Sequence, residues 1–444
     1  MTIMRRHIHF IGIGGIGVSA LARLYRSRGF QVSGSDISRS EITDALKKES
    51  IQTFIGKHKA ANVAGSVTNV IHTAAIRSDN PELVIAKRRR IPTRTYARAL
   101  GELSRGYRLI AIAGSHGKST TTALTALALI RGKFDPTMVI GTKLREFRNS
   151  NFRLGRGAWL VIEADEYRAS FLNYRPTIAV VTNIDREHLD YYRTVANVEA
   201  AFLKFLLRIQ LNGTAVLNRD DRRTRRVGRK LARSRKDIRI IWYSLRDAAA
   251  VKIRKVIRIP GRHNVSNALA AVQVASTLRV PRSVSYRAIA SYRGAWRRFD
   301  YQDHFAGAKV FADYAHHPTE IMATLQGARE RFPKNRIWCV FQPHHYERTR
   351  LLYKEFSRAF KNCDALVLLD IYEVAGREHA GRDNRVNSER LAKAVTRRGT
   401  PALYLNNPRR LKPFLKRWLK PGDILLMMGA GDIWEMTKEL AGRK

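Results

Sequence analysis

The stretch AIAGSHGKSTTTA, residues 111–123, continues an apolar run and leads into residues with helical spacing, so it predicts a turn between a strand and a helix. A glycine-containing turn at this place presents backbone N–H groups at the positive end of the helix, where they can bind phosphate. Lys118 is placed for β- and γ-phosphates and Ser119 for magnesium. The P-loop match is incomplete, because Ile112 stands where that pattern has a glycine. A phosphate site is therefore predicted, with an ordinary glycine turn as the alternative.

Two apolar runs after this turn predict buried strands of the same domain. GAWLVIEADE spans residues 157–166 and TIAVVTNID spans 177–185, and both end in acidic or amide residues. Such runs suit a parallel sheet, which collects ligands at the carboxyl ends of its strands. Glu163 and His188 follow these runs, and with Ser119 they could hold magnesium around a nucleotide. Taken alone, an acid or a histidine at such a place is more often structural.

The amino-terminal segment predicts a βαβ unit. Residues 7–36, HIHFIGIGGIGVSALARLYRSRGFQVSGSD, contain a short apolar strand, a glycine turn, a stretch with helical spacing and a second strand. The glycines match the dinucleotide-binding pattern loosely, and Asp36 stands about where that pattern has its ribose-binding acid. Tight packing of the helix on the strand is the alternative explanation. Glycines and Arg23 interrupt the apolar block, which favours this interpretation over a signal peptide.

Further apolar runs extend the pattern to three α/β units. VTNVIHTAAI at 67–76 and a strand around Ile91 belong to the first unit. A third series follows the segment 259–275, and its apolar runs are AKVFADY, RIWCVFQ, DALVLLDIY and DILLMMGAG. The sequence therefore predicts an α/β protein with domains at residues 1–105, 106–293 and 294–444.

Three polar motifs flank the third series. HNVSN at 263–267 could cap a helix or line a site, and RRFD at 297–300 could begin a salt-bridged strand. DYAHHPTE at 313–320 is harder to explain as structure, because two adjacent histidines between an acid and a proline make a poor core. This last motif therefore predicts a functional site.

The charge of the chain is strongly positive. Lys and Arg number 82 against 37 Asp and Glu, a formal net charge of +45 that would attract nucleic acid, acidic membranes and anionic metabolites alike. The excess is spread along the chain, which favours drift of surface positions to arginine. Its densest block, residues 220–236, predicts a solvated helical face without the aromatic residues of a single-strand binder. No specific nucleic-acid partner is expected.

Cysteine content and hydropathy indicate the compartment. Cys339 and Cys363 are too few for a disulfide framework, which favours a reducing compartment and a cytoplasmic protein. No long uncharged apolar run is present, so no membrane span is expected.

The order of the motifs is more specific than any one of them. GIGGIG, GSHGKSTTT, EADE, TNIDREHLDYY, PGRHNVSNALAA, RRFD, DYAHHPTEI, FQPHHYERT and GAGDI resemble, in that order and over nearly the whole chain, the Mur ligases of peptidoglycan synthesis. The resemblance implies a Rossmann-like amino-terminal domain for a UDP sugar, a central P-loop-type ATPase domain and a Rossmann-like carboxyl-terminal domain for an amino acid. DYAHHPTE and FQPHHYERT are similar to the members that join L-alanine to UDP-N-acetylmuramate.

The resemblance also implies the reaction. The lactyl carboxylate of UDP-N-acetylmuramate attacks the γ-phosphate of ATP to give an acyl phosphate, and the alanine amine then displaces phosphate. ATP and Mg²⁺ are the expected nucleotide and metal, and a monomer or homodimer is expected. Two alternatives stay open: a related ligase with glycine, serine or a murein peptide as acceptor, and a basic polymer-binding protein built on a ligase scaffold.

Site residues follow from the resemblance, position by position. Lys118, His188 and Arg298 would be catalytic, with Arg298 reaching the γ-phosphate from the third domain. The ATP site would comprise Gly114, Ser115, His116, Gly117, Lys118, Ser119, Thr120, Asn264, Asn267, Arg298 and Asp313. The UDP-sugar site would comprise Gly14, Gly15, Gly17, Ser35 and Asp36. The metal ligands would be Ser119, Glu163 and His188, and the amino-acid pocket would comprise Tyr314, His316, His344 and Arg348.

The chain departs from the family pattern at a few positions. Ser115 and Ser119 replace threonines and keep their hydroxyls. Glu187 stands where aspartate usually precedes the histidine, and Val18 where methionine is common. His345 occupies a place where arginine is frequent, which weakens the expected grip on the alanine carboxylate.

Overall fold

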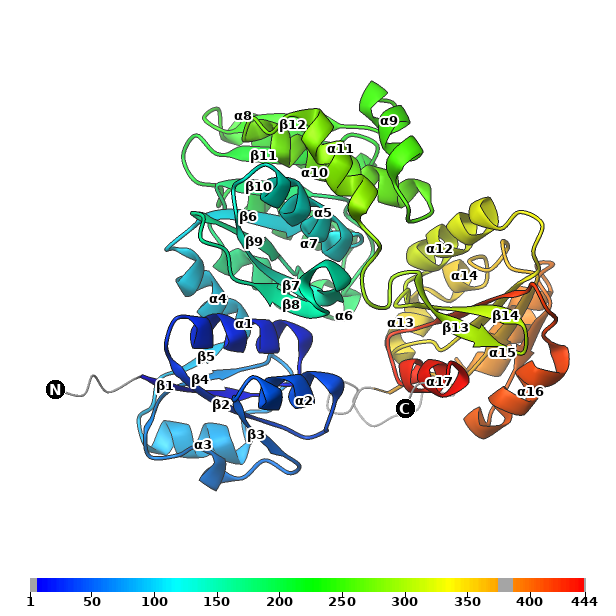
Figure 1. Cartoon of the computed structure of the whole chain (residues 1–444), viewed down its shortest axis with the longest axis horizontal. Helices are drawn as coiled ribbons and strands as arrows, with labels where there is room; N and C mark the ends of the chain where they lie inside the picture. Colours follow the sequence, from blue (N-terminus) through cyan, green and yellow to red (C-terminus); the bar gives the residue numbers. More distant parts are fainter. Residues whose placement is uncertain (1–5, 374–385, 443–444) are drawn as a thin grey trace. The chain divides into compact units, whose positions relative to one another are not determined.

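The computed structural model describes residues 6–373 and 386–442. Within them the chain forms three sheets, of five, seven and six strands, each covered by helices (Figure 1). By internal contacts the chain divides into two units. One comprises the residues up to Val256 together with Ser266–Ser291, and the other comprises Ile257–Val265 together with the residues from Tyr292 onward.

The first sheet is parallel, with the order β3-β2-β1-β4-β5. Ile8 and Phe10 point to the face that packs on the first helix, whereas His7 and His9 point to the other face. The predicted βαβ unit is confirmed, and the strand expected around Ile91 begins two residues later. The elements are β1 His7–Ile11, α1 Ile16–Ser27, β2 Gln31–Asp36, α2 Glu41–Lys48, β3 Gln52–Ile55, η1 Ala60–Asn62, β4 Val67–His72, α3 Pro81–Arg88, β5 Thr93–Thr95 and α4 Tyr96–Ser104.

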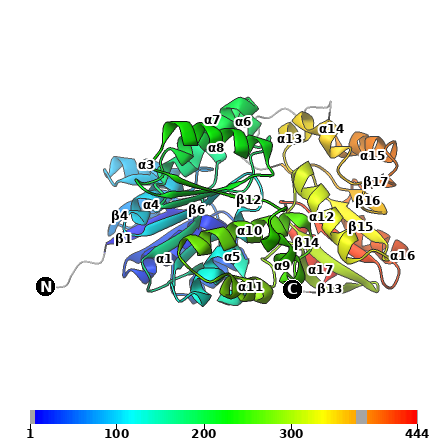
Figure 2. The ribbon, with the colours of Figure 1, turned by 90° about the horizontal axis from the view of Figure 1, so that it is seen from above.

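The second sheet has the order β12-β11-β10-β6-β9-β7-β8 and belongs to the same unit. Helices α7 and α8 cover one face, and α5 and α11 cover the other (Figure 2). Burial on both faces explains why the inner strands are continuous apolar runs. The elements are β6 Arg108–Ala113, α5 Lys118–Arg131, β7 Thr137–Leu144, η2 Arg145–Phe147, β8 Ser150–Arg153, β9 Trp159–Glu163, η3 Tyr167–Asn173, β10 Ile178–Val181, α6 Leu189–Tyr192, α7 Val195–Leu206, β11 Thr214–Asn218, α8 Arg222–Ser234, β12 Arg239–Tyr243, α9 Ala248–Val256, α10 Arg262–Thr277 and α11 Arg282–Ser291.

The third sheet has the order β13-β14-β18-β15-β16-β17, and only its edge pair β13 and β14 is antiparallel. Its inner strands are buried on both faces: Phe341 lies in one hydrophobic cluster and Val340 in the other. The elements are β13 Asp300–Phe305, β14 Ala308–Asp313, α12 Pro318–Arg331, β15 Ile337–Phe341, α13 Tyr346–Leu351, α14 Tyr353–Phe356, β16 Ala365–Leu368, α15 Ser388–Thr396, β17 Ala402–Tyr404, η4 Pro408–Arg410, α16 Leu411–Trp418, β18 Ile424–Met428 and α17 Ile433–Leu440.

Three features that the composition draws attention to can be compared with the structure. The basic block at 220–236 does form a helix, α8, whose buried positions include Val227 and Leu231. In the described part of the chain, no helix combines the length and the apolar character needed to cross a membrane. Both cysteines are free and buried.

Candidate active site

The central glycine turn, residues 114–117, lies between β6 and α5. Gly114 and Gly117 have φ angles of +138° and +82°, a region that side-chain-bearing residues rarely adopt. A Cβ atom at Gly117 would overlap the side-chain amide of Asn267, and one at Gly114 would overlap the Thr182 hydroxyl. Both glycines are therefore required for the turn to form at all, and the helix begins immediately after it.

The residues that follow β10 hold this turn in place. The backbone N–H of His116 donates to Oδ1 of Asn183 at 2.9 Å, and Nδ2 of Asn183 donates to the carbonyl of His116 at 3.0 Å. The Thr182 hydroxyl donates to the same carbonyl at 2.6 Å. These bonds fix the conformation of the turn before any ligand arrives. They engage the N–H of His116, and the carbonyl of Asn183 likewise accepts the N–H of Ser115 at 3.0 Å.

Lys118 is the charged residue at the start of α5. Its Nζ donates to the carbonyl of Gly114 at 2.7 Å and lies 2.7 Å from Oε2 of Glu166, whose side chain is 1% exposed. Burial alone would lower the pKa of Lys118, but the charges of Glu166, Asp165 and Glu163 outweigh it and raise that pKa. Lys118 is therefore a fixed cation beside the turn.

Two acidic residues and a histidine form a cluster beside the ammonium group of Lys118. Ligand atoms of Asp165, Glu166 and His188 lie within 4.8 Å of one another, and Oε1 of Glu166 is buried without a hydrogen-bond partner. The expected ligand Glu163 ends β9 and accepts a hydrogen bond from the backbone of Gly141 at 2.9 Å. This donor set of carboxylates and an imidazole fits a divalent cation, and the unsatisfied oxygen gives a reason for one to bind.

Ser119 and Thr120, the other residues expected at the nucleotide phosphates, occupy the first turn of α5 and are nearly buried. Asp165 and Glu166 were not singled out from the sequence, although they lie in the same EADE motif as Glu163. The sequence could place three carboxylates at this strand end, but it could not tell which of them would contact Lys118.

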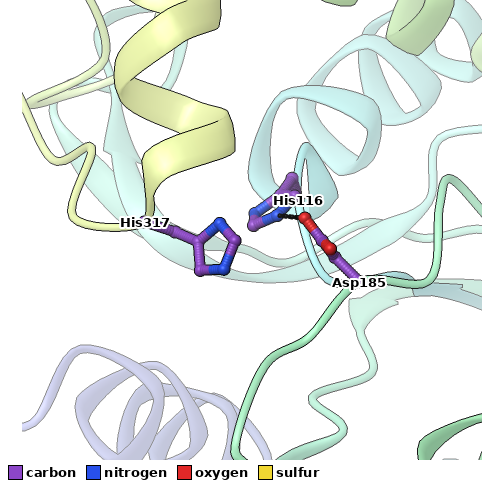
Figure 3. A group of neighbouring side chains, drawn as sticks. All are labelled: His116, Asp185 and His317. Atoms are coloured by element: carbon purple, nitrogen blue, oxygen red, sulfur yellow. Dashed lines mark hydrogen bonds and ion pairs between the residues drawn. The ribbon is translucent and has the colours of Figure 1, made fainter. Parts of the chain in front are cut away.

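His116 points away from the turn toward a second carboxylate. Its Nε2 lies 3.0 Å from Oδ2 of Asp185 (Figure 3). The backbone N–H of Asp185 donates to the Ser115 hydroxyl at 2.8 Å. Ser115 and His116, both expected at the ATP site, are therefore tied to the TNID motif, which contributes Asp185 as an orienting acid.

The amino-terminal glycine turn, residues 12–15, is arranged differently, and the last glycine of GIGGIG, Gly17, lies in the first turn of α1. The backbone N–H of Gly14 donates to Oδ2 of Asp36 at 2.8 Å. Gly15 is the residue that precedes α1, and a Cβ atom at Gly17 would press on the ring of Tyr96. The expected UDP-sugar residues Gly14, Gly15, Gly17 and Asp36 thus lie together at the carboxyl ends of β1 and β2, where a parallel sheet places its ligands.

Ser35 joins that turn to a buried polar network. Its side chain is 1% exposed, and its hydroxyl donates to Oε2 of Glu82 at 2.5 Å. Glu82 is fully buried at the start of α3, and its carboxylate also lies 3.1 Å from Nε2 of His9 and accepts from Asn62 at 2.6 Å. Burial would raise the pKa of Glu82, but the bonds from His9, Ser35 and Asn62 lower it to about 2. Neither Glu82 nor His9 was predicted from the sequence.

In the second unit, Asp313 ends β14 and supports two backbone groups. Its carboxylate accepts from the N–H of Phe299 and from the N–H of Ala315, both at 2.8 Å. Burial raises the pKa of Asp313 to about 6, against the opposing charge of Arg298. Arg298 lies 3.8 Å from Glu320, and its guanidinium is 5.2 Å from the ring of Tyr314.

Arg297, the neighbour of Arg298, is the residue that connects the RRFD motif to GAGDI. Its guanidinium lies 4.8 Å from the ring of Tyr314 and 5.7 Å from that of Trp434, and its Nη2 donates to the carbonyl of Gly429 at 3.1 Å. The aromatic rings and the carbonyl compensate the buried charge, although burial lowers its pKa.

The residues expected at the amino-acid pocket lie close together in the second unit. The ring of His316 is 5.3 Å from that of Tyr314 and 6.1 Å from that of His344. Arg348 donates weakly to the carbonyl of His344 at 3.5 Å. His345 precedes α13 with a φ of 73°. One guanidinium, several imidazole donors and aromatic walls form a set that suits a small carboxylate.

Helix α10 carries both expected asparagines. Asn267 contacts Gly117 in the first unit, and Nδ2 of Asn264 in the second unit donates to the carbonyl of Pro260 at 2.6 Å. Asn267 is therefore directly beside the central glycine turn.

A glycine turn with a fixed lysine, followed by acidic strand ends, defines an α/β protein of the phosphate-binding, P-loop-like class. Comparison with known proteins is more specific. Residues 7–108 match the family described as "Mur ligase family, catalytic domain", residues 112–275 "Mur ligase middle domain", and residues 297–431 "Mur ligase, glutamate ligase domain". The chain belongs to the Mur ligase family, and the predicted three-domain α/β architecture is confirmed.

Relatives match over nearly their whole length. UDP-N-acetylmuramate–L-alanine ligase of Geobacter sp. (strain M21) is 42% identical, with 98% of this chain and 96% of the relative covered. The protein of the same name from Desulfosudis oleivorans is 40% identical, with 99% of each covered. The crystal structure of UDP-N-acetylmuramate-alanine ligase from Thermotoga maritima has a TM-score of 0.80 and 27% identity, with 98% of each chain covered.

Proposed function

We propose that this protein is an ATP-dependent ligase that joins L-alanine to the lactyl carboxylate of UDP-N-acetylmuramate in peptidoglycan precursor synthesis. The observation that carries the proposal is the fixed cation Lys118 beside the central glycine turn, with carboxylates behind it. The full-length relatives named for this activity support it. A cytoplasmic monomer or homodimer remains our prediction for the working form.

The first step is transfer of the γ-phosphate of ATP to the lactyl carboxylate. The N–H groups at the amino terminus of α5, which begins directly after the turn, bind the nucleotide phosphates. The ammonium of Lys118 neutralises charge that develops on the transferring group. Ser119, Glu163, Glu166 and His188 are the residues that would hold a magnesium ion, which supplies further positive charge to the phosphates. Asn267 and Asp313 contribute to binding of the adenine and the ribose, and Arg298 to the γ-phosphate.

The second step is attack of the alanine amine on the acyl phosphate. The carbon–nitrogen bond forms through a tetrahedral intermediate, and inorganic phosphate leaves with the electron pair of the broken carbon–oxygen bond. Arg348 and the imidazoles of His316 and His344 hold the alanine carboxylate, so that the amine is aligned with the reacting carbon. Alignment and charge neutralisation, rather than covalent help from the protein, account for this step.

The experiment that tests the proposal is phosphate release from ATP in the presence of UDP-N-acetylmuramate and one acceptor at a time. We expect release to require the UDP sugar, to be fastest with L-alanine and to be detectable with glycine, because one methyl group is worth only about 1–3 kcal/mol. If a murein peptide stimulated phosphate release and alanine did not, the alternative of a related ligase with a murein peptide as acceptor would be favoured. If the protein released no phosphate from ATP with any acceptor and bound DNA tightly, the polymer-binding alternative would be favoured.

A further inference from the structure

A cavity with a volume of about 340 Å³ opens beside the end of α4, away from the residues described above. It is bounded by the end of α4, by the segment between η3 and β10, and by the residues that follow α7. Its lining residues are Gly101, Ser104, Arg105, Asn173, Arg175, Arg208 and Gln210. The volume lies at the lower end of the range for small-molecule sites.

The lining of this cavity contains three arginines and no acid. Among the residues that the structure describes, Arg105, Arg175 and Arg208 form no ion pair with a carboxylate. The guanidinium of Arg208 is held by a hydrogen bond from Nε to the carbonyl of Tyr174 at 3.2 Å. Burial and the like charge of Arg175 lower the pKa of Arg208. The cavity therefore concentrates positive charge that the protein itself does not neutralise.

The positive charge of the whole chain does not by itself explain this feature. A second cavity of about 350 Å³ is lined by Arg23, Arg26, Ser27, Glu49, Ser150 and Phe152. There Arg23 lies 2.8 Å from the carboxylate of Glu49 and donates to Asn151. The second cavity therefore contains a carboxylate, that of Glu49, which pairs with one of its arginines. The first cavity has no such carboxylate, although both belong to the same arginine-rich chain.

The end of helix α7 does not account for Arg208 either. Cations often stabilise the carbonyls at the carboxyl terminus of a helix, and α7 ends close to the cavity. The carbonyls of Leu207 and Ile209 at that end already accept hydrogen bonds from Arg235, at 2.9 and 3.3 Å. Arg235 is in turn paired with Asp237 at 2.6 Å. Arg208 is therefore not needed as a cap for this helix.

We propose that the cavity lined by Arg105, Arg175 and Arg208 is a binding site for a small phosphate-bearing anion. Guanidinium groups bind phosphate oxygens through paired N–H donors, and three of them would share one doubly charged group. The cavity precedes β6 and β10, whereas the central glycine turn follows the carboxyl end of β6. The two sites lie at opposite ends of the parallel strands β6 and β10, so an anion in the cavity is separate from the nucleotide phosphates.

The test is the thermal unfolding midpoint of the full chain titrated with inorganic phosphate and, separately, with glucose 6-phosphate, at an ionic strength held constant with chloride. We compare the parent with Arg175→Gln and Arg105→Gln, and with the matched control Arg26→Gln from the second cavity, which removes the same unit of charge. The central glycine turn is intact in all four proteins, so its phosphate binding cancels in the comparison.

We expect saturable stabilisation of the parent, with apparent affinity about tenfold weaker in Arg175→Gln and in Arg105→Gln and unchanged in Arg26→Gln. A response to glucose 6-phosphate alone would still support the site and identify the ligand as a phosphate ester. Equal weakening in Arg26→Gln would overturn the proposal, because the effect would then be general charge. A parent that is stabilised by neither inorganic phosphate nor glucose 6-phosphate more than by chloride would also overturn the proposal.

Discussion

The amino-terminal glycine turn and the central glycine turn both join the carboxyl end of a buried strand to a helix, yet a carboxylate faces the first and an ammonium faces the second. Asp36 accepts the N–H of Gly14 at 2.8 Å, so the first turn has its donor already engaged by an anion. In the second, Lys118 is held against carbonyl and carboxylate oxygens on one side. The backbone motif determines where a polar group can be bound, and the side chains beside it determine which one.

This difference predicts different ligands for two turns of similar outline. An acid beside a turn suits a ligand that offers hydroxyl or N–H donors, such as a ribose. A lysine and hydroxyls beside a turn suit phosphate. Substitutions at the two turns should therefore separate the UDP sugar from ATP in kinetic measurements.

The largest effect is expected at Lys118. Lys118→Ala removes the cation that neutralises developing charge, so kcat/KM should fall by about a thousandfold or more, because preorganised charges act mainly in the transition state. Binding of the UDP sugar, measured by calorimetry, should be unchanged. Lys204→Ala, an exposed lysine on α7, is the matched control. Activity of Lys118→Ala within about tenfold of the parent would contradict the role.

The next effect is expected at Glu82, which supports the first turn through Ser35. Its pKa of about 2 lies below the ordinary 4.5, so its ionised form stabilises the fold above pH 4.5, and this contribution is lost as the pH falls from 4.5 toward 2. Glu82→Gln should therefore lower the free energy of unfolding at pH 7 by about 3 kcal/mol and flatten its dependence on pH in that window.

Urea unfolding at a series of pH values measures this effect. Glu49→Gln, which removes a half-exposed partner of Arg23, is the control and should change the free energy of unfolding by less than about 1 kcal/mol. If Glu82→Gln kept the slope of the parent between pH 4.5 and 2, the buried network would not be the source of that stability.

A smaller effect is expected at Asp36. Asp36→Ala leaves the N–H of Gly14 without its acceptor and removes the acid beside the turn, so the KM for UDP-N-acetylmuramate should rise about thirtyfold while the KM for ATP stays within about twofold. Asp44→Ala, which removes an exposed partner of Arg39 in α2, is the control and should change neither. A parallel rise in both KM values would mean that the two turns do not act separately.

The smallest effect is expected at Arg348, where an anion is expected to bind without any glycine turn. Arg348→Ala should raise the KM for alanine about tenfold and leave that for ATP nearly unchanged, because a guanidinium can pair with both carboxylate oxygens. His345→Arg should lower the KM for alanine modestly. Alaninamide that reacts as well as alanine would remove the carboxylate pocket from this segment.

Much of this arrangement could be predicted from local sequence. Strands buried on both faces appear as apolar runs, and the strand, turn and helix around residues 111–123 lie where the pattern places them. Short edge strands give a weaker signal. β5 has three residues and lies beyond Ile91, and the edge hairpin of β7 and β8 was not expected. Edge strands bury little, so their composition differs less from that of a loop.

The parts that the sequence did not predict depend on contacts between distant residues. Glu82 meets His9 across 73 positions of the chain, and a single glutamate in the first turn of a helix gives no local sign of a buried partner. Glu166 contacts Lys118 across 48 positions, and only the fold selects it among the acids of EADE. The positions of the glycine turns are a property of local sequence, whereas the charges beside them are set by tertiary packing.

The central claim is that the turn with Lys118 directs the lactyl carboxylate onto the γ-phosphate of ATP. The direct measurement uses UDP-N-acetylmuramate with ¹⁸O in that carboxylate, together with ATP and L-alanine, followed by mass analysis of the products. One labelled oxygen should appear in each molecule of released inorganic phosphate, because the bond between the carboxyl carbon and that oxygen breaks when the amine attacks. Unlabelled phosphate, or label in AMP, would contradict the account.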